Sequence, residues 1–443
     1  MYNIKYILKK KKEKKYIIKG WVKYFRNNIF LDINDGSTNK NLQVILKKKK
    51  FNKIKKKIII GIPIKIYGKL IKIKDKYEIL PDKIKILGKI NKFFFNNSIL
   101  QNKYHTLSKL RKQYHLRFRT NIFSAIMRIR HTMSLEIHNF FNKKNYYYIH
   151  TPIITNNNVE GGSEVFELKN KNKIFKDKVY LTVSGQLEAE SAILGLKKVY
   201  TFGPVFRSEN SNTNKHLSEF WMVEPEIMFY KLKDIMKLSV NIIKYLIKKI
   251  LNKNKDDLNY LEEYHNKNKN KIGINLKKKL NYIIKKKFLK ISYSKLIKLL
   301  IRVKKKIIKW GDDIKKEHEK IIFKKIFTKN LPLIVYNYPK KIKPFYMKIN
   351  KDNLTVKSID VLLPNVGEII GGSERENTYD KLKINIKKKK IKEKKILWYL
   401  NLRNIGEINH SGFGLGFDRL VQFITGMKNI RDIIPYPIYP GKY

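Results

Sequence analysis

Residues 199–229 read VYTFGPVFRSENSNTNKHLSEFWMVEPEIMF, and this segment predicts the architecture around it. Two apolar and aromatic runs flank the polar loop Ser208–Leu217, a pattern typical of a strand, a long loop and an antiparallel strand. Because side chains alternate along a strand, four of them would share one face of the second run: Phe220, Met222, Glu224 and Glu226. A buried carboxylate needs a partner, which Arg207 could supply. A surface hairpin with a salt bridge remains the alternative for this segment alone.

A second motif, Gly412-Phe-Gly-Leu-Gly-Phe-Asp-Arg419, places glycine at every other position of a predicted strand. A strand face without side chains lets a flat ligand lie against the backbone. Arg419 would stand near the first turn of the following helix, where an anion is readily bound. The spacing matches neither a Rossmann fingerprint nor a P-loop. Glycines that mark an ordinary bulge are the alternative.

A third motif, DVLLPNVGEIIGGSER, spans Asp360 to Arg375. A hairpin at its Pro-Asn-Val-Gly turn would bring Asp360 and Glu368 together, and paired carboxylates suit a hard cation such as Mg²⁺. Gly371-Gly372 would allow close approach of a ligand before Arg375. Together, the three motifs predict a nucleotide–Mg²⁺ site that is not of the P-loop type.

The N-terminal 92 residues predict a small β domain. Short β-branched and aromatic runs alternate with turn signals, of which Asn27-Asn28 and Asp35-Gly36 are the clearest. About five strands favour a barrel of the oligonucleotide-binding (OB) type, with a generic sandwich as the alternative. The expected strands are Tyr16–Tyr24, Ile29–Asn34, Asn41–Leu46, Ile58–Ile73 and Lys76–Leu80.

The rest of the chain predicts a hinge at 93–120 and an α+β domain at 121–443. Apolar residues recur at helical spacing from Asn121 to Asn142. Alternating Ile/Leu and Lys at about 235–330 predicts a Lys-rich helical insertion in which we expect no chemistry. Strands return from Leu333 onward.

The charge of the chain is strongly positive: 99 Lys+Arg stand against 36 Asp+Glu, a formal net charge of +63. Basic surface suits a nucleic-acid partner. Only 12 of the basic residues are arginine, however, and a drift toward A/T-rich codons would scatter lysines over any surface. We attribute most lysines to this drift, which makes each arginine more informative.

Several classes of protein and site are excluded or disfavoured by the composition. Cysteine is absent, which excludes disulfides, Cys-ligated zinc and thiol catalysis. No apolar run approaches the length of a membrane span, and the N-terminus shows no secretory signal, so we expect a cytoplasmic protein with no membrane association.

These motifs together resemble those of the class II aminoacyl-tRNA synthetases, and their amino-acid sequences are most similar to those of the bacterial asparaginyl group. The helix that leads to Thr151-Pro152, the hairpin at 199–229 and GFGLGFDRL resemble the family's motifs 1, 2 and 3. Further similar segments are RTNIFSAIMRIRHTM (119–133), EGGSEVF (160–166), SGQLEAE (184–190), EIIGGSERE (368–376) and RDIIPYP (431–437). The resemblance implies an OB-fold anticodon-binding barrel followed by a catalytic domain with an antiparallel sheet flanked by helices.

The resemblance also implies that asparagine and ATP form asparaginyl-adenylate, and that the amino acid then passes to tRNA(Asn). Arg207 would contact the α-phosphate and Arg419 the γ-phosphate, which makes these two the expected catalytic residues. The other expected ATP-site residues are Glu209 near adenine, His216 at the pyrophosphate tail, Phe220 under adenine, and Asp360 and Glu368 as Mg²⁺ ligands.

For the amino acid, the resemblance implies that Glu160 and Gln186 hold the α-amino group, that Arg375 faces the side-chain carbonyl, and that Glu224 accepts from the amide. Aspartyl enzymes carry a lysine where this chain has Ala189, so Arg375 and Glu224 would sum to a neutral pocket that favours asparagine. Glu374, beside Arg375, could pull on the guanidinium. An aspartyl or relaxed-specificity ligase, an ammonia-dependent asparagine synthetase and a decayed RNA-binding relative remain the alternatives.

The expected partners are tRNA(Asn), L-asparagine and a second copy of the chain, with no other stable protein partner. By resemblance, Arg26, Phe30 and Gln43 would contact the anticodon. The apolar face of residues 122–141, together with Pro152, would form the homodimer interface. Phe118, where proline is common in the family, lies in the hinge.

Overall fold

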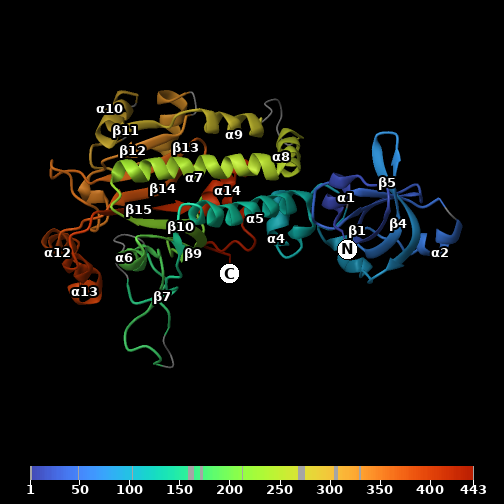
Figure 1. Ribbon diagram of the computed structural model, residues 1–443, viewed down its shortest axis with the longest axis horizontal. Helices are drawn as coiled ribbons and strands as arrows, with labels where there is room; N and C mark the ends of the chain where they lie inside the picture. The colour runs from blue at the N-terminus through green and yellow to red at the C-terminus, as the bar shows by residue number, and fades with distance from the viewer. Residues whose placement is uncertain are drawn as a thin grey trace. The chain divides into compact units, whose positions relative to one another are not determined.

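The computed structural model describes residues 2–47, 49–101, 103–157, 164–169, 173–211, 213–267, 275–303, 308–328 and 331–442 (Figure 1). The chain divides into two compact units. The first comprises Met1–Arg130 and Lys253–Asn275, and the second comprises His131–Asn252 and Leu276–Tyr443. The segment Lys253–Asn275, which belongs to the expected insertion, thus packs with the first unit. The domain limits drawn from the sequence stay predictions.

The first unit contains a closed five-stranded barrel of strand order β1-β2-β3-β5-β4, as predicted for the OB type. Its strands are β1 (Lys15–Arg26), β2 (Phe30–Asn34), β3 (Leu42–Ile45), β4 (Pro63–Ile73) and β5 (Lys76–Ile86). The predicted turn between β1 and β2 is confirmed, since Asn27 and Asn28 have φ of 50° and 52°. Asparagine tolerates this left-handed conformation better than most residues.

The core of the barrel forms because alternate apolar residues of each strand point inward. Leu31, Val44 and Ile79 come from neighbouring strands and are all fully buried. Ile4 and Ile7 of the N-terminal helix α1 (Ile4–Lys10) join the same core. The strand expected over 58–73 begins only at Pro63.

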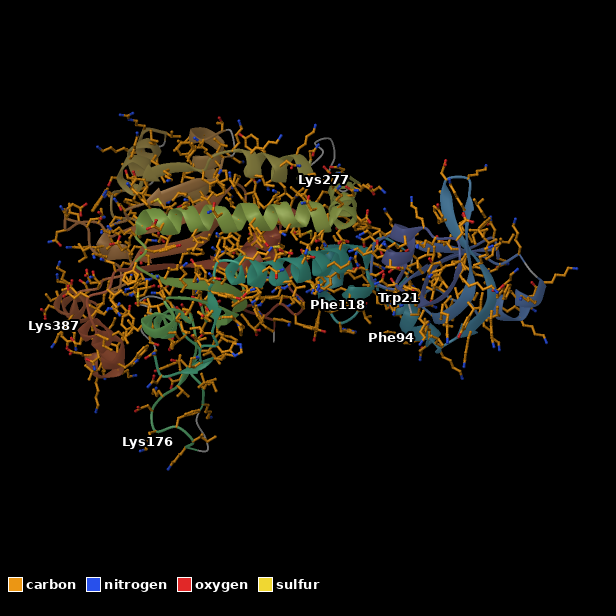
Figure 2. All side chains as sticks on the ribbon, in the orientation of Figure 1. Trp21, Phe94, Phe118, Lys176, Lys277 and Lys387 are labelled. Atoms are coloured by element: carbon orange, nitrogen blue, oxygen red, sulfur yellow. The ribbon has the colours of Figure 1, made fainter. Side chains whose placement is uncertain are left out.

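The first unit also contains several helices. The short helices η1 (Lys49–Phe51) and α2 (Asn52–Lys55) lie between β3 and β4. The helices that follow the barrel are α3 (Lys92–Asn97), α4 (Leu107–Lys112), the short η2 (Arg117–Arg119), the first part of α5 (Asn121–Asn142) and α8 (Lys255–Lys267). Helix α5 has the predicted bounds. Phe118 makes an edge-to-face contact with Phe123 at 5.1 Å, so it serves local packing (Figure 2).

The second unit is built on an eight-stranded sheet of order β11-β12-β13-β14-β15-β10-β9-β6 (Figure 1). The pairs β11–β12 and β6–β9 are parallel, and the other neighbours are antiparallel. The strands are β6 (Tyr147–Tyr148), β9 (Lys198–Phe206), β10 (Glu219–Met228), β11 (Leu289–Ser292), β12 (Leu333–Tyr336), β13 (Ser358–Leu363), β14 (Gly367–Glu374) and β15 (His410–Gly416). The predicted strand–loop–strand at 199–229 is therefore confirmed as β9 and β10.

The helices of the second unit surround this sheet. Helix α6 packs against β9 and β10, and α14 packs against β10 and β14. The helices are α6 (Gln186–Leu196), α7 (Leu232–Lys253), α9 (Leu276–Lys285), α10 (Tyr293–Val303), α11 (Lys316–Ile321), α12 (Tyr379–Lys388), α13 (Glu393–Asn401) and α14 (Phe417–Thr425). The short helices are η3 (Ile322–Ile326), η4 (Lys340–Ile342), η5 (Leu402–Asn404) and η6 (Ile430–Asp432), and a separate strand pair joins β7 (Ile154–Thr155) to β8 (Tyr180–Leu181).

The expected helical insertion is helical in most of its described part, with one exception. Residues 289–292 form β11 and extend the main sheet through parallel pairing with β12. The sequence did not predict this four-residue strand, because a short apolar run does not distinguish a strand from a helix by its periodicity.

Two general expectations concern the surface. Lys176 and Lys387 are exposed, as expected for lysines that are solvated rather than functional (Figure 2). Within the described residues, no helix combines the length and the apolar character that a membrane crossing requires.

Candidate functional site

A cavity of about 310 Å³ lies over β10, β14 and β15 in the second unit. It is lined by all ten described residues that were expected at the ATP and amino-acid sites: Gln186, Arg207, Glu209, His216, Phe220, Glu224, Asp360, Glu368, Arg375 and Arg419. These residues come from separate parts of the sequence, and the antiparallel sheet brings them to one face. Glu160, the remaining candidate, lies outside the described residues.

Glycines make the floor of this cavity, as predicted, but the exposed backbone is shorter than expected. Gly414 and Gly416 of β15 line the cavity together with Gly371 and Gly372 of β14. The space in front of Gly412, by contrast, is filled by the carboxylate of Glu226. Gly412, the first glycine of the motif, therefore accommodates a buried side chain of the protein and leaves no room there for a ligand.

The loop between β9 and β10 carries the polar residues of one wall. The Arg207 guanidinium lies 5.4 Å from the centre of the Phe220 ring. His216 Nδ1 lies 2.7 Å from Ser211 Oγ and 3.0 Å from Thr213 Oγ1. Burial, followed by the charge of Arg419, lowers the pKa of His216. Burial first, and the nearby cations second, thus disfavour the charged form of the His216 ring, and an anion bound here would offset the charge of those cations.

Arg419 stands in the first turn of α14, as predicted, and faces the cavity. Its Nη1 donates to the carbonyl oxygen of Glu368 at 2.9 Å, which ties the helix to β14. The preceding residue, Asp418, accepts from the backbone N–H of Trp221 at 2.8 Å. The first turn of α14 is thus anchored to two strands of the sheet, to β14 through Arg419 and to β10 through Asp418.

The expected metal ligands lie together across Gly371. A Cβ at Gly371 would lie 3.1 Å from Glu368 Oε1 and 3.6 Å from Asp360 Oδ1, so the glycine leaves both carboxylates facing the same space. Burial and the charge of Asp360 raise the pKa of Glu368 to about 7. A pair of carboxylates that repel each other in this way fits a divalent cation.

A buried lysine shares this site with the two carboxylates. Lys343 Nζ donates to both oxygens of Asp360, at 2.8 and 3.0 Å, and lies 4.0 Å from the centre of the buried Tyr338 ring. Burial would lower the pKa of Lys343, but Asp360 and Glu368 raise it above its ordinary value. Lys343 therefore supplies a resident positive charge that sequence patterns did not reveal.

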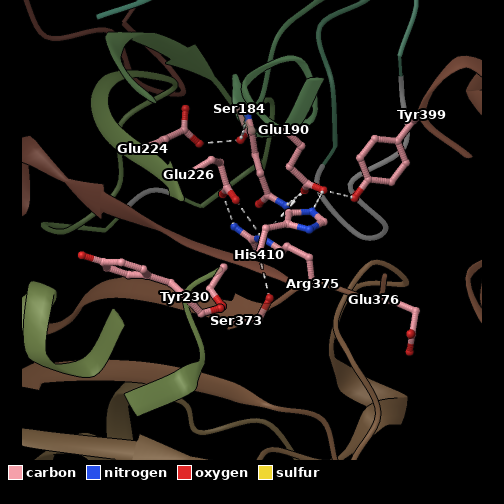
Figure 3. A network of polar contacts seen from close by, with 12 residues as sticks. Ser184, Glu190, Glu224, Glu226, Tyr230, Ser373, Arg375, Glu376, Tyr399 and His410 are labelled. Atoms are coloured by element: carbon pink, nitrogen blue, oxygen red, sulfur yellow. Dashed lines mark hydrogen bonds and ion pairs between the residues drawn. The ribbon is translucent and has the colours of Figure 1, made fainter. Parts of the chain in front are cut away.

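At the other end of the cavity, Arg375 forms a buried ion pair with Glu226 (Figure 3). Arg375 Nη1 also donates to Ser373 Oγ at 2.7 Å, and its Nε lies 3.7 Å from Glu190 Oε1. Burial would lower the pKa of Arg375, but the Glu226 and Glu190 carboxylates raise it above its ordinary value. The expected partner for the carboxylates of β10 was Arg207, so the pairing with Arg375 is a correction.

Glu190 is the centre of a hydrogen-bond network behind Arg375 (Figure 3). Its carboxylate accepts from Tyr399 OH at 2.7 Å, His410 Nε2 at 2.8 Å, Gln186 Nε2 at 2.9 Å and Arg403 Nη2 at 3.0 Å. Burial would raise the pKa of Glu190, but Arg403 and His410 hold it well below its usual range. Glu190 is therefore an anion in this arrangement.

His410 joins this network through both ring nitrogens. Its Nε2 faces the Glu190 carboxylate, and its Nδ1 faces the carbonyl oxygen of Ile408 at 2.9 Å. These two partners fix the orientation of the ring.

Glu224 stands apart from this network and is also buried. It accepts from Ser184 Oγ, from the Gly185 N–H at 2.9 Å and from Thr201 Oγ1 at 3.3 Å. Burial raises its pKa, while these hydrogen bonds lower it in part. Two buried arginines, Arg375 and Arg403, therefore lie among three buried carboxylates at this end: Glu190, Glu224 and Glu226. The charge balance of the pocket thus involves more groups than the two expected.

Glu374 and Ala189, which were expected to influence the charge around Arg375, do not lie beside its guanidinium. Glu374 points to the opposite face of β14, where Lys357 pairs with its carboxylate at 2.8 Å, so it does not pull on the guanidinium. Ala189 is fully buried with Ile193 and Val199 and does not belong to the cavity lining. The side chains of Glu374 and Ala189 both point away from the cavity, and the spacing of residues in the sequence did not show this direction.

The insertion contacts residues that line the cavity, contrary to expectation. Glu319 of α11 pairs with Lys215 Nζ at 3.0 Å and accepts from the Glu368 N–H at 3.0 Å. No sequence signal marked Glu319. Arg403 could have been singled out, because arginines are rare in this chain.

On the barrel, the three expected anticodon residues lie on adjacent strands. Arg26 Nη2 donates to Asp32 Oδ2 at 3.0 Å and to Gln43 Oε1 at 3.1 Å, and Gln43 Nε2 donates to Glu78 Oε1 at 3.0 Å. Phe30 pairs with Arg26 across the β1–β2 hairpin and is half-buried. The strand pairing thus brings the polar groups and the ring together on neighbouring strands.

Two family models match the chain. "tRNA synthetases class II (D, K and N)" matches residues 107–439, and "OB-fold nucleic acid binding domain" matches residues 16–87.

Curated relatives extend this similarity over nearly the whole chain. The asparagine–tRNA ligase of Cytophaga hutchinsonii is 43% identical over 96% of this chain and 94% of its own length. That of Borrelia garinii is also 43% identical, over 96% and 95%. Among solved structures, asparaginyl-tRNA synthetase from Pyrococcus horikoshii complexed with asparaginyl-adenylate has a TM-score of 0.84 at 30% identity, covering 97% of this chain and 96% of that one.

Proposed function

This chain belongs to the tRNA synthetases class II (D, K and N), and on that basis we propose that it ligates asparagine to tRNA. Asparagine and ATP give asparaginyl-adenylate and pyrophosphate, and the asparaginyl group then passes to tRNA(Asn) with release of AMP. The observation that carries the proposal is the cavity of about 310 Å³, which gathers ten residues of the types that this reaction requires.

The residues of the nucleotide end act by position and charge, because no side chain needs to serve as a nucleophile. Phe220 stacks on adenine, and Glu209 lies beside it. Arg207 stabilises the negative charge that develops on the α-phosphate. Arg419 and His216 hold the β- and γ-phosphates, whose charge complements the cationic surroundings of His216.

Asp360 and Glu368 are the residues that would hold Mg²⁺. When bound, the ion neutralises phosphate charge and orients the pyrophosphate leaving group. Lys343 already compensates Asp360, so Glu368 carries the less compensated negative charge of the pair.

At the amino-acid end, Glu224 selects for the amide of asparagine. A carboxylate offers about four acceptor positions, and Ser184, Gly185 and Thr201 use three of them. The remaining position suits one N–H of the asparagine amide. Aspartate has no donor for it, and an unpaired buried acceptor is costly.

Arg375 faces the side-chain carbonyl of asparagine, and Gln186 holds the α-amino group together with Glu160. Arg375 is oriented by its ion pair with Glu226, so its guanidinium is held in place before the substrate arrives. Three buried carboxylates, Glu190, Glu224 and Glu226, surround this arginine, which disfavours a substrate carboxylate relative to a neutral amide.

The barrel recognises the anticodon. Phe30 offers a ring for stacking an unpaired base, and Arg26 and Gln43 offer hydrogen-bonding groups next to it. Stacking of a splayed base combined with readout of its edge is the usual mode of single-stranded RNA recognition.

The chain forms a homodimer, but not through the face of α5 that the sequence suggested. The apolar residues of that face are already buried in the single chain: Ile122, Ile126, Ile129, Met133, Ile137, Phe140 and Phe141. The segment after α5 exposes four large apolar or aromatic residues next to Pro152, namely Tyr147, Tyr148, Ile153 and Ile154. Such a cluster marks an interface, and sedimentation of a Tyr148→Glu variant tests it. A variant that sediments like the unaltered chain would contradict this interface.

The experiment that tests the function is amino-acid-dependent exchange between ATP and pyrophosphate, with asparagine and aspartate compared side by side. Exchange with asparagine alone supports the proposal and the role of Glu224. Exchange with both amino acids would support a relaxed-specificity ligase, and exchange with neither would contradict the catalytic proposal. Charging of tRNA(Asn) then tests the second step.

A further inference from the structure

Helix α11 of the insertion reaches the loop that lines the nucleotide end of the cavity. Glu319 Oε2 lies 3.0 Å from Lys215 Nζ, and Lys316 Nζ donates to Asn214 Oδ1 at 3.0 Å. Lys215 itself lines the cavity. Two side chains of one short helix thus hold two consecutive residues of this loop.

Glu319 also holds the opposite wall of the cavity. Its Oε1 accepts from the backbone N–H of Glu368 at 3.0 Å, so a single carboxylate connects the loop to β14. Its carboxylate occupies the space in front of Gly367, whose φ of +88° and missing side chain leave room for it. Any side chain at Gly367 would collide with this carboxylate. The position of the Glu319 side chain therefore requires glycine at residue 367.

The pair formed by Lys215 and Glu319 differs in exposure from the surface pairs of the chain. The two side chains are 16% and 14% exposed, whereas those of Lys178 and Glu167 are 69% and 48% exposed. Surface pairs contribute little because water screens them. Burial lowers the pKa of Lys215, and the carboxylate of Glu319 counteracts that effect. Glu319 therefore places the ammonium group and favours its charged form.

We propose that Glu319 is a positioning residue for ATP, acting through Lys215. By holding the Lys215 ammonium at the cavity wall, beside the charge of Arg419, it prepares a cationic site for the β- and γ-phosphates and for the pyrophosphate product. The amino-acid end of the cavity does not depend on Glu319. This inference rests on the proposed function, since it assigns a role to the nucleotide end of the same cavity.

The test is steady-state exchange between ATP and pyrophosphate for Glu319→Gln, which keeps an acceptor for the Glu368 N–H but removes the charge. We expect KM for ATP to rise on the order of tenfold, the effect of losing one charge-assisted interaction, while KM for asparagine changes less than about twofold. Glu317→Gln is the matched control on the same helix, because its side chain is 68% exposed, and we expect it to leave both constants unchanged.

A double-mutant cycle separates positioning from simple structural support. If Glu319 acts through Lys215, Glu319→Gln has no further effect on KM for ATP in a Lys215→Met background. An equal rise of both KM values, or additive effects in the cycle, would overturn the inference. Thermal unfolding of each variant, with and without pyrophosphate, reports folding and phosphate binding independently of turnover.

Failure of this inference is distinguishable from failure of the proposed function. An unaltered chain without exchange would contradict the function. An active chain whose Glu319→Gln variant keeps the same KM for ATP contradicts the role of Glu319 alone.

Discussion

Replacing Glu190 by glutamine tests the network that holds Arg375. The carboxylate is buried and accepts four hydrogen bonds, of 2.7 to 3.0 Å, from Tyr399, His410, Gln186 and Arg403. A glutamine oxygen in place of Oε2 can keep the three bonds from Tyr399, His410 and Arg403, but the NH₂ group in place of Oε1 would face the Gln186 amide, which donates there now. Loss of that bond to a charged acceptor is worth about 1.5–3 kcal/mol. The substitution also removes the negative charge of a buried ion pair, which costs about 3–5 kcal/mol, so we expect a loss of about 4 kcal/mol.

The measurement is thermal or urea unfolding, together with exchange assays on asparagine and aspartate. About 4 kcal/mol corresponds to a fall in Tm of about 10 °C for a unit of this size. Removal of one negative charge behind Arg375 also makes the pocket more positive, so we expect the preference for asparagine over aspartate to decrease. Glu407→Gln, at an exposed position, is the matched control and should change neither quantity.

The result that would refute this reasoning is specific. A Glu190→Gln variant that unfolds within about 1 kcal/mol of the unaltered chain, with the same ratio of asparagine to aspartate activity, would show that the network does not hold Arg375. If the variant is less stable but has the same ratio of asparagine to aspartate activity, Glu190 contributes to folding and not to substrate selection.

Three further predictions concern the nucleotide end of the cavity. Phe220→Ala should raise KM for ATP by about 5- to 150-fold, since stacking on a base is worth about 1–3 kcal/mol, and an unchanged KM would exclude stacking. His216 has a lowered pKa that bound phosphate would raise, so pyrophosphate should bind more tightly as pH falls from about 8 to 6, an effect that calorimetry should find absent in His216→Asn. Asp360→Asn leaves the buried Lys343 without its partner and should cost about 3–5 kcal/mol, and Lys343→Met in the same chain should recover part of that loss in urea unfolding.

Local patterns in the sequence were sufficient for most of the architecture. Helix α5 has the predicted bounds because its apolar residues recur at helical spacing over 22 residues. The barrel follows from alternating β-branched residues and from the turn at Asn27-Asn28. The strand β11 was missed because four residues do not define a period.

The same patterns identified the residues of the cavity but not their partners. Glu224 and Glu226 were correctly placed on one face of β10, since alternation along a strand is a local property. Whether Glu226 meets Arg207 or Arg375 depends on the order of strands in the sheet. The placement of β15 between β10 and β14 determined that pairing.

Residue types, their spacing and the family resemblance that they carry were therefore readable from the sequence alone: an OB barrel, a class II catalytic sheet and the side chains that face its substrates. Only the tertiary structure showed that Glu190 meets Arg403 and His410, which follow it by 213 and 220 residues, and that Glu319 of the insertion reaches Lys215. The physical reason is that the partners in a buried ion pair depend on where the two side chains lie and in which direction they point. The local spacing of residue types along the sequence determines neither.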